Sequence, residues 1–338
     1  IQDSDGSFTA ESFGVPSDGS DATPASLAAA NTRKLIIFAN KSYKFLTAFV
    51  IPTQAKLLGQ QADIELDASW KPNGNDISIE GFSFRTTATM PTDIIYVDKA
   101  NCARLSIVRN KFQSPLSNSN GVKVVVDSTA VQVSEVLIKE NDFTNIGRMG
   151  VEFQDHSADT TIRISGYKIE DNTFDTLGVS SFGFGISLSG YMTSGSVVRN
   201  EFKNCEIGVE MIGCSETDVS YNKFRGGCTK AISGTGSRVM TNNKITYNTD
   251  TTSTESQYFW MQDGLLSQGN SWNTQIWMRD TINSKFIGEK VHTTQSSALF
   301  IEGDSSNNEF IDCLLSNINA SNSSTLRTNG AGCFDNHL

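Results

Sequence analysis

Apolar and polar positions alternate along this chain in short runs, and one order of residue types returns many times. An Asn followed two residues later by a Phe occurs at 108–112, 139–143, 170–174, 198–202 and 220–224. An aliphatic residue stands three positions before each of these Asn residues. A fixed internal spacing with a variable length between copies indicates a repeated supersecondary unit whose loops differ in length.

Each repeated unit is predicted to contain short β-strands. The runs GVEFQ, GISLS and GVEMI alternate between inward and outward positions with the period of two that strands require. Helical runs of comparable length are missing, and so is the Leu pattern of leucine-rich repeats. We therefore predict a parallel β-helix of about nine or ten coils, in which like residues stack coil on coil.

On such a fold the repeated Phe and Asn residues are expected to build structure. Phe side chains of successive coils would form an apolar column inside. Asn side chains would form an amide ladder at a bend, where they satisfy unpaired backbone groups and tolerate a left-handed backbone. The aligned apolar column contains Phe84, Phe112, Phe143, Phe174, Phe202, Phe224, Ile245, Trp272, Phe286 and Phe310. The matching Asn positions are Asn110, Asn141, Asn172, Asn200, Asn222, Asn243, Asn270 and Asn308.

Both ends of an open β-helix are prone to edge-to-edge association, so caps are expected. Residues 20–31 predict one helix, with Thr23 as its N-cap and Pro24 in its first turn, covering the N-terminal end. The expected division is an entry and capping segment at 1–60, the parallel β-helix at 61–315 and a C-terminal cap or junction at 316–338.

The stretch ESFGVPSDGSDATPASLAAAN opens the chain with a recognisable motif. A Phe-Gly-Val is followed by Asp-Gly, a second Asp, a Thr and a short Ala-rich helix, then by a Tyr-centred turn and an Ile-Pro strand. The matching residues are Phe13, Gly14, Val15, Asp18, Gly19, Asp21, Thr23, Tyr43, Ile51, Pro52, Leu58 and Gly59. With the repeat at 80–310, this opening resembles the pectate-lyase-like superfamily of right-handed parallel β-helices. The usual Pro-x-Gly before the Tyr is replaced by residues 39–42, which is expected to alter only the turn.

Within that superfamily, this opening followed by Asn- and Ser-rich coils looks most like a bacteriophage tailspike or capsule depolymerase. The resemblance implies an all-β, single-stranded right-handed parallel β-helix that binds and cleaves bacterial surface polysaccharide. No cofactor is expected. It also implies a homotrimer in the virion tail, acting at the bacterial cell surface. An upstream virion-binding domain, removed here, would explain why the chain opens with Ile1. Because fold does not fix the reaction, the resemblance says less about chemistry.

Composition argues against several functional classes. The net charge is −10 and no Lys/Arg run occurs, so nucleic acid is not an expected partner. No apolar stretch approaches the ~18 residues that a membrane span needs. The six Cys show no CxxC spacing and the three His are widely scattered, so no metal site is expected.

One residue column is expected to carry chemistry, because the apolar residues beside it should point inward and leave it facing solvent. In order, the column contains Lys123, Glu152, Ser187, Glu210, Ser233, Phe259 and Trp277. Glu152 and Glu210 stand two coils, or ~9.6 Å, apart, and inverting glycosidases hold their acid and base ~6.5–9.5 Å apart. The two aromatic residues could stack sugar rings. The leading prediction is an endo-acting glycoside hydrolase, although two exposed Glu are also ordinary solvated charges.

Three alternatives remain open at this stage. Asp127 and Asp155 end strands of adjacent coils, ~4.8 Å apart, close to the separation of a retaining pair, although Asp at strand ends usually shapes turns. A polysaccharide lyase would need a base and a cation that neutralises a uronate carboxylate, and Lys123 or Arg148 near Glu152 could supply the cation. A receptor-binding module would hold the glycan without cutting it.

Overall fold

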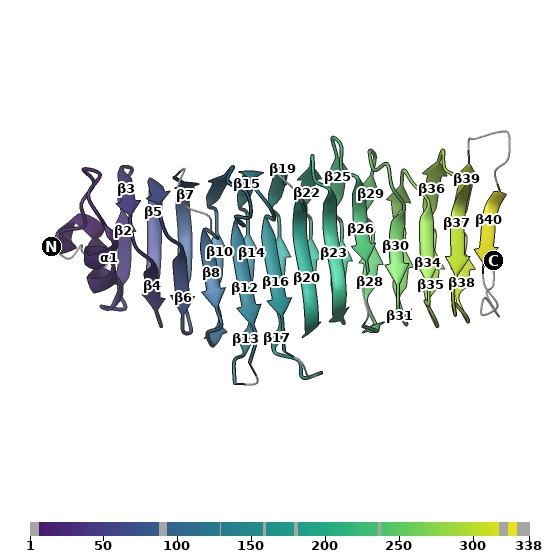
Figure 1. The fold of residues 1–338 in the computed structure, drawn as a ribbon, viewed down its shortest axis with the longest axis horizontal. Helices are drawn as coiled ribbons and strands as arrows, with labels where there is room; N and C mark the ends of the chain where they lie inside the picture. The colour runs from purple at the N-terminus through teal and green to yellow at the C-terminus, as the bar shows by residue number, and fades with distance from the viewer. Residues whose placement is uncertain are drawn as a thin grey trace. The chain divides into compact units, whose positions relative to one another are not determined.

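The computed structural model describes residues 7–87, 93–128, 130–157, 160–178, 182–235, 238–317 and 324–329. The chain is a right-handed parallel β-solenoid of about 13 turns, which confirms the predicted fold class (Figure 1). The turns outnumber the nine or ten repeat units because coils already form before the first Asn-x-Phe. It divides into two compact units, residues 1–183 and 184–338, which we describe separately.

The first unit is built from two parallel sheets that the chain visits in turn, and a small third strip beside them. One sheet contains β1 (Phe8–Thr9), β2 (Leu35–Phe38), β3 (Ser42–Phe45), β5 (Lys56–Leu66), β7 (Ser78–Thr86), β10 (Ser106–Val108), β11 (Lys111–Ser114), β14 (Leu137–Lys139), β15 (Asp142–Ile146), β18 (Lys168–Glu170) and β19 (Thr173–Leu177). The other contains β4 (Phe49–Pro52), β6 (Trp70–Asn73), β8 (Ile95–Asp98), β12 (Val122–Val126) and β16 (Val151–Asp155), with β9 (Cys102–Ala103), β13 (Val133–Ser134) and β17 (Ile164–Ser165) beside it. Successive coils pair in register, so alternate side chains meet in an interior core.

The second unit repeats this plan. One sheet contains β21 (Ser196–Val198), β22 (Glu201–Lys203), β24 (Asp218–Ser220), β25 (Lys223–Arg225), β28 (Lys244–Thr246), β29 (Thr249–Asp250), β32 (Leu266–Gln268), β33 (Ser271–Trp272), β35 (Lys285–Ile287), β36 (Lys290–Thr293), β38 (Glu309–Ile311) and β39 (Leu314–Asn317). The other contains β20 (Phe184–Thr193), β23 (Ile207–Ser215), β26 (Lys230–Gly234), β30 (Gln257–Trp260), β34 (Ile276–Arg279), β37 (Ser297–Glu302) and β40 (Ser324–Asn329), and β27 (Met240–Thr241) pairs with β31 (Gln262–Asp263). The predicted cap or junction at 316–338 lies mostly outside the described residues and stays a prediction.

Helix α1 (Thr23–Ala30) lies at the N-terminal end of the first unit and packs against β4 and the short helix η1 (Ala10–Phe13) (Figure 1). Its start differs from the prediction, because the N-cap residue is Ala22 and Thr23 is already helical. The Asp21 carboxylate accepts the backbone amide of Thr23 at 3.0 Å and its hydroxyl at 2.6 Å. Asp21 therefore accepts a free amide of the first helical turn, that of Thr23 itself, and Thr23 is not the capping residue.

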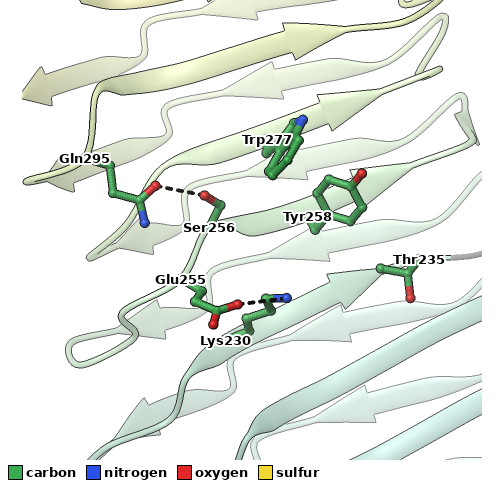
Figure 2. Close-up of a pocket in the computed structure, with 7 residues that line it drawn as sticks. All are labelled: Lys230, Thr235, Glu255, Ser256, Tyr258, Trp277 and Gln295. Atoms are coloured by element: carbon green, nitrogen blue, oxygen red, sulfur yellow. Dashed lines mark hydrogen bonds and ion pairs between the residues drawn. The ribbon is translucent and has the colours of Figure 1, made fainter. Parts of the chain in front are cut away.

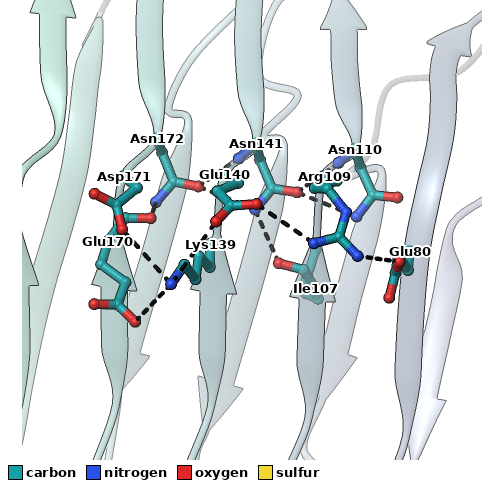
Figure 3. A network of polar contacts seen from close by, with 10 residues as sticks. All are labelled: Glu80, Ile107, Arg109, Asn110, Lys139, Glu140, Asn141, Glu170, Asp171 and Asn172. Atoms are coloured by element: carbon teal, nitrogen blue, oxygen red, sulfur yellow. Dashed lines mark hydrogen bonds and ion pairs between the residues drawn. The ribbon is translucent and has the colours of Figure 1, made fainter.

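The repeated Asn residues form a buried side-chain ladder in the first unit, as predicted (Figure 3). The Oδ1 atom of Asn141 accepts the backbone amide of Asn110 at 2.9 Å and its side-chain amide at 3.1 Å. The Asn141 side chain donates to Oδ1 of Asn172 at 3.0 Å and to the Ile107 carbonyl at 2.9 Å. The ladder thus satisfies backbone groups that the bend between two strands leaves unpaired.

The ladder of the second unit uses a different Asn from the one predicted. It joins Asn200, Asn222, Asn248 and Asn270 through bonds of 3.1, 3.0 and 3.0 Å. Asn243 instead accepts the backbone amide of Thr217 at another bend, and Asn308, which was also predicted for the ladder, accepts the backbone amide of Ser284 at the corresponding bend of a later coil. The repeat pattern favoured Asn243 because an apolar Ile245 follows it by two residues, whereas Asp250 stands at that place after Asn248.

Phe rings stack inside the first unit in the order of the sequence. Centroid distances are 5.3 Å between Phe84 and Phe112, 4.7 Å between Phe112 and Phe143, and 4.9 Å between Phe143 and Phe174. Each of these pairs is stacked within 11° of parallel. This is the apolar column that the Asn-x-Phe repeat predicts.

In the second unit the Phe column is shorter than predicted. Phe202 and Phe224 stack at 4.9 Å, but the next coil places Asp250 opposite Phe224. Ile245 pairs with Val219 and belongs to the neighbouring aliphatic column, which Ser267, Phe286 and Phe310 continue. The predicted places of Ile245, Phe286 and Phe310 in the Phe column are therefore wrong. The alignment followed apolar residues, and Asp250 interrupts the apolar pattern of the true column.

The Asn ladder of the second unit ends on a buried carboxylate. Glu289 accepts hydrogen bonds from Asn270 Nδ2 at 2.9 Å, Ser267 Oγ at 3.1 Å and Trp272 Nε1 at 2.7 Å. Glu289 is fully buried. Burial raises its pKa to about 7 from the ordinary 4.5, and the hydrogen bonds from these three donors oppose that rise.

This buried carboxylate should make stability depend on pH. Between pH 4.5 and pH 7 the unfolded chain has released the Glu289 proton while the folded chain retains it, so unfolding free energy falls as pH rises. We expect the wild type to lose about 3 kcal/mol relative to Glu289→Gln across this window. Urea denaturation of both proteins from pH 4.5 to 8 measures this, and parallel pH profiles would contradict it.

Candidate functional site

The outward face of one sheet in the second unit carries a column of aligned side chains. From β20 to β40 the register places in line Ser187, Glu210, Ser233, Tyr258, Trp277, Phe300 and Arg327. The residues beside Glu210, Val209 and Met211, are buried in the core. Because side chains alternate between the two faces of a strand, the column points away from the core, but Ser187 and Ser233 are buried by their neighbours and do not face solvent as predicted. We call these seven residues the outer column.

The predicted order of residues agrees with this register except at one aromatic position. Phe259 pairs with Gly234 and Met278 and is fully buried in the core. Tyr258 takes the outward position that was assigned to Phe259. Three consecutive aromatic residues at 258–260 leave no apolar and polar alternation, so this pattern could not reveal which of them faces outward.

Two aromatic side chains of the outer column adjoin a pocket of about 370 Å³. Figure 2 shows Tyr258 and Trp277 close together at the pocket, and their ring centroids lie 4.8 Å apart at 78°. Phe300 follows in the column, 5.4 Å from Trp277. Trp277 Nε1 is buried and has no hydrogen-bond partner among the described residues, so Trp277 offers the pocket its aromatic ring and not its N–H.

The opposite edge of the pocket is polar (Figure 2). The Lys230 ammonium and the Glu255 carboxylate form an ion pair at 3.0 Å, and Ser256 Oγ donates to Gln295 at 2.9 Å. Thr235 completes the lining. Sugars combine an apolar ring face with a rim of hydroxyls, so aromatic faces on one side and polar groups on the other suit a saccharide.

Glu210 is the carboxylate of the outer column. Its Oε2 atom accepts the Ser187 hydroxyl at 2.6 Å, which orients the side chain. Ser233 separates Glu210 from Tyr258, and its buried hydroxyl has no partner in the described part of the chain. Two coils correspond to ~9.6 Å at backbone spacing, so Glu210 lies about that far along the column from Tyr258.

The first unit brings Lys123, Arg148 and Glu152 together in a second cluster. Lys123 and Glu152 stand opposite each other on β12 and β16, and Lys123 Nζ lies 3.1 Å from Glu152 Oε2. Arg148 approaches the same oxygen at 3.2 Å, and the Asn120 amide donates to it at 3.1 Å. Glu152 is 2% exposed, so it is a buried, doubly paired carboxylate and not a solvated charge.

A further carboxylate of this cluster was missed in the sequence. Asn120 also donates to Asp93 Oδ1 at 2.6 Å, so one amide links Asp93 to Glu152. Burial raises the pKa of Asp93, the charge of Glu152 adds to the rise, and Lys123 opposes it. Asp93 precedes β8 and lies outside the alternating run that marks the strand, so the column alignment did not include it.

The structure does not bring Asp127 and Asp155 together as a retaining pair. The register places Asp155 opposite Val126, one residue before Asp127. Asp155 is buried, accepts the Ser157 amide at 2.9 Å and lies 3.9 Å from Arg163. Asp127 is outside the core and pairs with Lys99 Nζ at 2.5 Å. The predicted pairing is wrong because neighbours in a strand point to opposite faces.

The other predicted pair is divided between the units. Glu152 belongs to the first unit and Glu210 to the second, so the ~9.6 Å separation expected from coil spacing stays a prediction.

Over the described residues, no group of three or more His, Cys, Asp or Glu is arranged to hold a metal ion. In the same part of the chain, no helix has the length and apolarity to cross a membrane. Cys333 and His337 lie outside the described residues.

Comparison with known proteins identifies the fold as a right-handed β-helix. A family model described as a right-handed β-helix region matches residues 93–249. No curated protein matches the chain by sequence. At sequence identities of 10–14%, similarity to solved structures establishes the fold alone.

Several solved structures share the fold. The Dettilon tailspike protein is 10% identical with a TM-score of 0.56, over 95% of this chain and 68% of its own. The A-module of the Azotobacter vinelandii mannuronan C-5 epimerase AlgE6 is 14% identical with a TM-score of 0.60, over 97% of this chain and 99% of its own. The catalytic unit of an α-1,3-glucanase from Streptomyces thermodiastaticus is 11% identical with a TM-score of 0.53, over 98% of this chain and 69% of its own.

Proposed function

We propose that this chain binds bacterial surface polysaccharide along the outer column of its second unit and depolymerises it, as a phage tailspike. The observation that carries the proposal is the row of Tyr258, Trp277 and Phe300, whose first two members line a polar-edged pocket. Aromatic faces stack on sugar rings, and the polar edge of the pocket can hydrogen-bond sugar hydroxyls. Proteins of similar fold include a tailspike and two enzymes named for the polysaccharides mannuronan and α-1,3-glucan, which supports this ligand class.

Binding should depend strongly on Trp277. The Trp277→Ala variant loses the central aromatic face of the row, and we expect its Kd for the polysaccharide to rise about 30-fold, or about 2 kcal/mol. Biolayer interferometry against capsules and O-antigens purified from a panel of bacterial strains measures this. The exposed Val239, truncated to Ala, is the control that should bind as the wild type does. Equal affinities for Trp277→Ala and the wild type would contradict the proposed surface.

For the reaction we propose hydrolysis that uses Glu210. In hydrolysis one carboxyl group protonates the glycosidic oxygen, and a second carboxylate activates a water molecule. Glu210 stands on the same column as the aromatic side chains, and Ser187 holds its side chain in place. The sequence predicts Glu152 as the second carboxylate. Glu255, which lines the pocket and belongs to the second unit as Glu210 does, is another candidate for that role.

Lyase chemistry is the second candidate, and the cluster in the first unit favours it. Lys123 and Arg148 place two cations at Glu152, which is the combination of charge neutralisation and base that uronate elimination needs. The products distinguish the reactions, because a lyase leaves an unsaturated sugar that absorbs in the near ultraviolet. Release of neither reducing ends nor unsaturated sugar would leave a receptor-binding module that holds glycan without cutting it.

A homotrimer and a place in the virion tail belong to the same proposal. A symmetric assembly would bury part of the exposed strand faces of each chain. Sedimentation equilibrium at micromolar concentration tests the trimer, since a single species of 36.8 kDa would remove it.

A further inference from the structure

The bends that hold the Asn ladders place one residue of each coil in the left-handed conformation, directly before the ladder residue. These residues are Arg109, Glu140, Asp171, Arg199, Tyr221, Tyr247, Gly269 and Gly288. Their φ values lie between 54° and 64°. This conformation is easy for Gly and strained for a bulky side chain. Most positions in this series carry a charged residue or Gly, and two carry Tyr.

Tyr221 and Tyr247 form an exposed aromatic pair between β24 and β25 and between β28 and β29. Their rings stack at 5.1 Å and 17°, and the residues are 54% and 45% exposed. The next residue in the series is Gly269, where an added Cβ would come within 2.8 Å of the Tyr247 ring. Gly269 therefore makes room for Tyr247. A strained and solvent-exposed aromatic pair lowers stability without serving the core, which points to a role in binding.

The two rings line a pocket of about 330 Å³, and we call it the tyrosine pocket. Its other lining residues are Arg199, Asn200, Glu201, Asn222, Lys223 and Thr249. The volume falls within the range of small-molecule sites. The lining apart from the rings is polar or charged, whereas the centre of a protein interface is mostly apolar. The tyrosine pocket therefore suits a small polar ligand that has a flat apolar face.

The charges around the tyrosine pocket favour an anionic ligand. Glu201 is held by Lys203 at 3.1 Å and Arg225 at 3.7 Å. Lys223 faces the pocket and has no ion-pair partner among the described residues, and Arg199 lines it too. Cations thus outnumber carboxylates here, although the whole chain carries a net charge of −10.

We propose that the tyrosine pocket is a second saccharide-binding site, which takes a short acidic segment of polysaccharide. A sugar ring packs against the Tyr221 and Tyr247 pair, and a carboxylate of the saccharide pairs with Lys223. This site lies on a different sheet of the second unit from the outer column and needs no catalytic group. This proposal takes from the proposed function only that the ligand is a saccharide.

The test uses oligogalacturonate hexamers as the acidic probe and maltohexaose as the neutral one, in calorimetric titrations of the full chain. The wild type should bind the acidic hexamer more tightly, with an affinity that falls at high salt. The double variant Tyr221→Gly/Tyr247→Gly should weaken this binding at least tenfold. Since Gly relieves the backbone strain, the double variant should melt no lower than the wild type, and this separates lost binding from lost folding. Lys223→Gln should remove the preference for the acidic hexamer.

The outcomes separate this site from the outer column. Acidic-hexamer binding that survives Trp277→Ala and is lost in the double Gly variant supports the tyrosine pocket. Binding that is lost in Trp277→Ala and unchanged in the double Gly variant overturns it, and so does a wild type that binds neither probe. If the double Gly variant instead turns an oligomer into monomers in sedimentation velocity, this face joins copies of the chain and the saccharide site is wrong. None of these results depends on whether Trp277 binds the host polysaccharide.

Discussion

The Asn141→Ala variant is expected to unfold with about 4 kcal/mol less free energy than the wild type. The substitution removes the acceptor for the Asn110 amides and the donor to the Ile107 carbonyl and to Asn172. These groups are buried, and each one left unpaired costs about 1–3 kcal/mol. Losses of this size add up only partly, because the cavity left by the amide can admit water. Urea denaturation followed by circular dichroism measures the change.

The neighbouring residue supplies the matched control. Glu140 precedes Asn141 and is exposed, and it pairs with Arg109 at 3.4 Å and Lys139 at 3.8 Å (Figure 3). Exposed ion pairs contribute little, so Glu140→Ala should change the unfolding free energy by less than about 0.5 kcal/mol. If the two variants are equally stable, the Asn ladder does not hold the bends together in the way described.

Replacing Glu210 with Gln is expected to reduce the rate of polysaccharide cleavage about 1,000-fold while leaving binding nearly unchanged. An amide cannot donate or take up the proton that hydrolysis transfers, and loss of a general acid or base costs 10²–10⁴ in rate. The Gln side chain can still accept the Ser187 hydroxyl, so the local geometry should persist. Reducing ends released per minute give kcat, and a fall in kcat with KM retained is the expected signature.

Two further substitutions show where the chemistry lies if this expectation fails. Glu216→Gln is the control, because this exposed Glu of the same unit accepts, among the residues that the structure describes, only the Thr193 and Ser194 hydroxyls. Cleavage that survives Glu210→Gln but is lost in Glu152→Gln would move the reaction to the cluster in the first unit. Cleavage that survives both would show that neither carboxylate is catalytic.

The sequence predicted the fold because its strongest pattern is also its strongest physical constraint. A buried Asn that pairs with the next coil and a Phe that stacks on the next Phe recur at one spacing, and few other architectures need that. The alignment of the repeats failed at the coil in which a polar residue takes the place of the Phe. Asp250 replaced the expected apolar residue after Asn248, so the alignment shifted to Asn243 and carried Ile245 with it.

For the candidate site, the alternation of inward and outward residues along each strand predicted which side chains lie in line, but not their burial. The line of Lys123 opposite Glu152, and of Ser187 opposite Glu210, follows from the alternation alone. The burial of Glu152 does not, because Arg148 and Asn120 approach it from outside the strands. The inward orientation of Phe259 could not be derived either, since its neighbours on both sides are aromatic.

Each bond of the Asn ladder joins a residue to its partner in the adjacent coil, whatever number of residues lies between them. The sequence separation is 31 from Asn110 to Asn141, 22 from Asn200 to Asn222 and 26 from Asn222 to Asn248, while the bond lengths hardly vary. The scaffold can therefore gain or lose loop residues between two rungs without disturbing either rung. Such a chain can acquire a new surface by recombination of its loops and keep its framework unchanged.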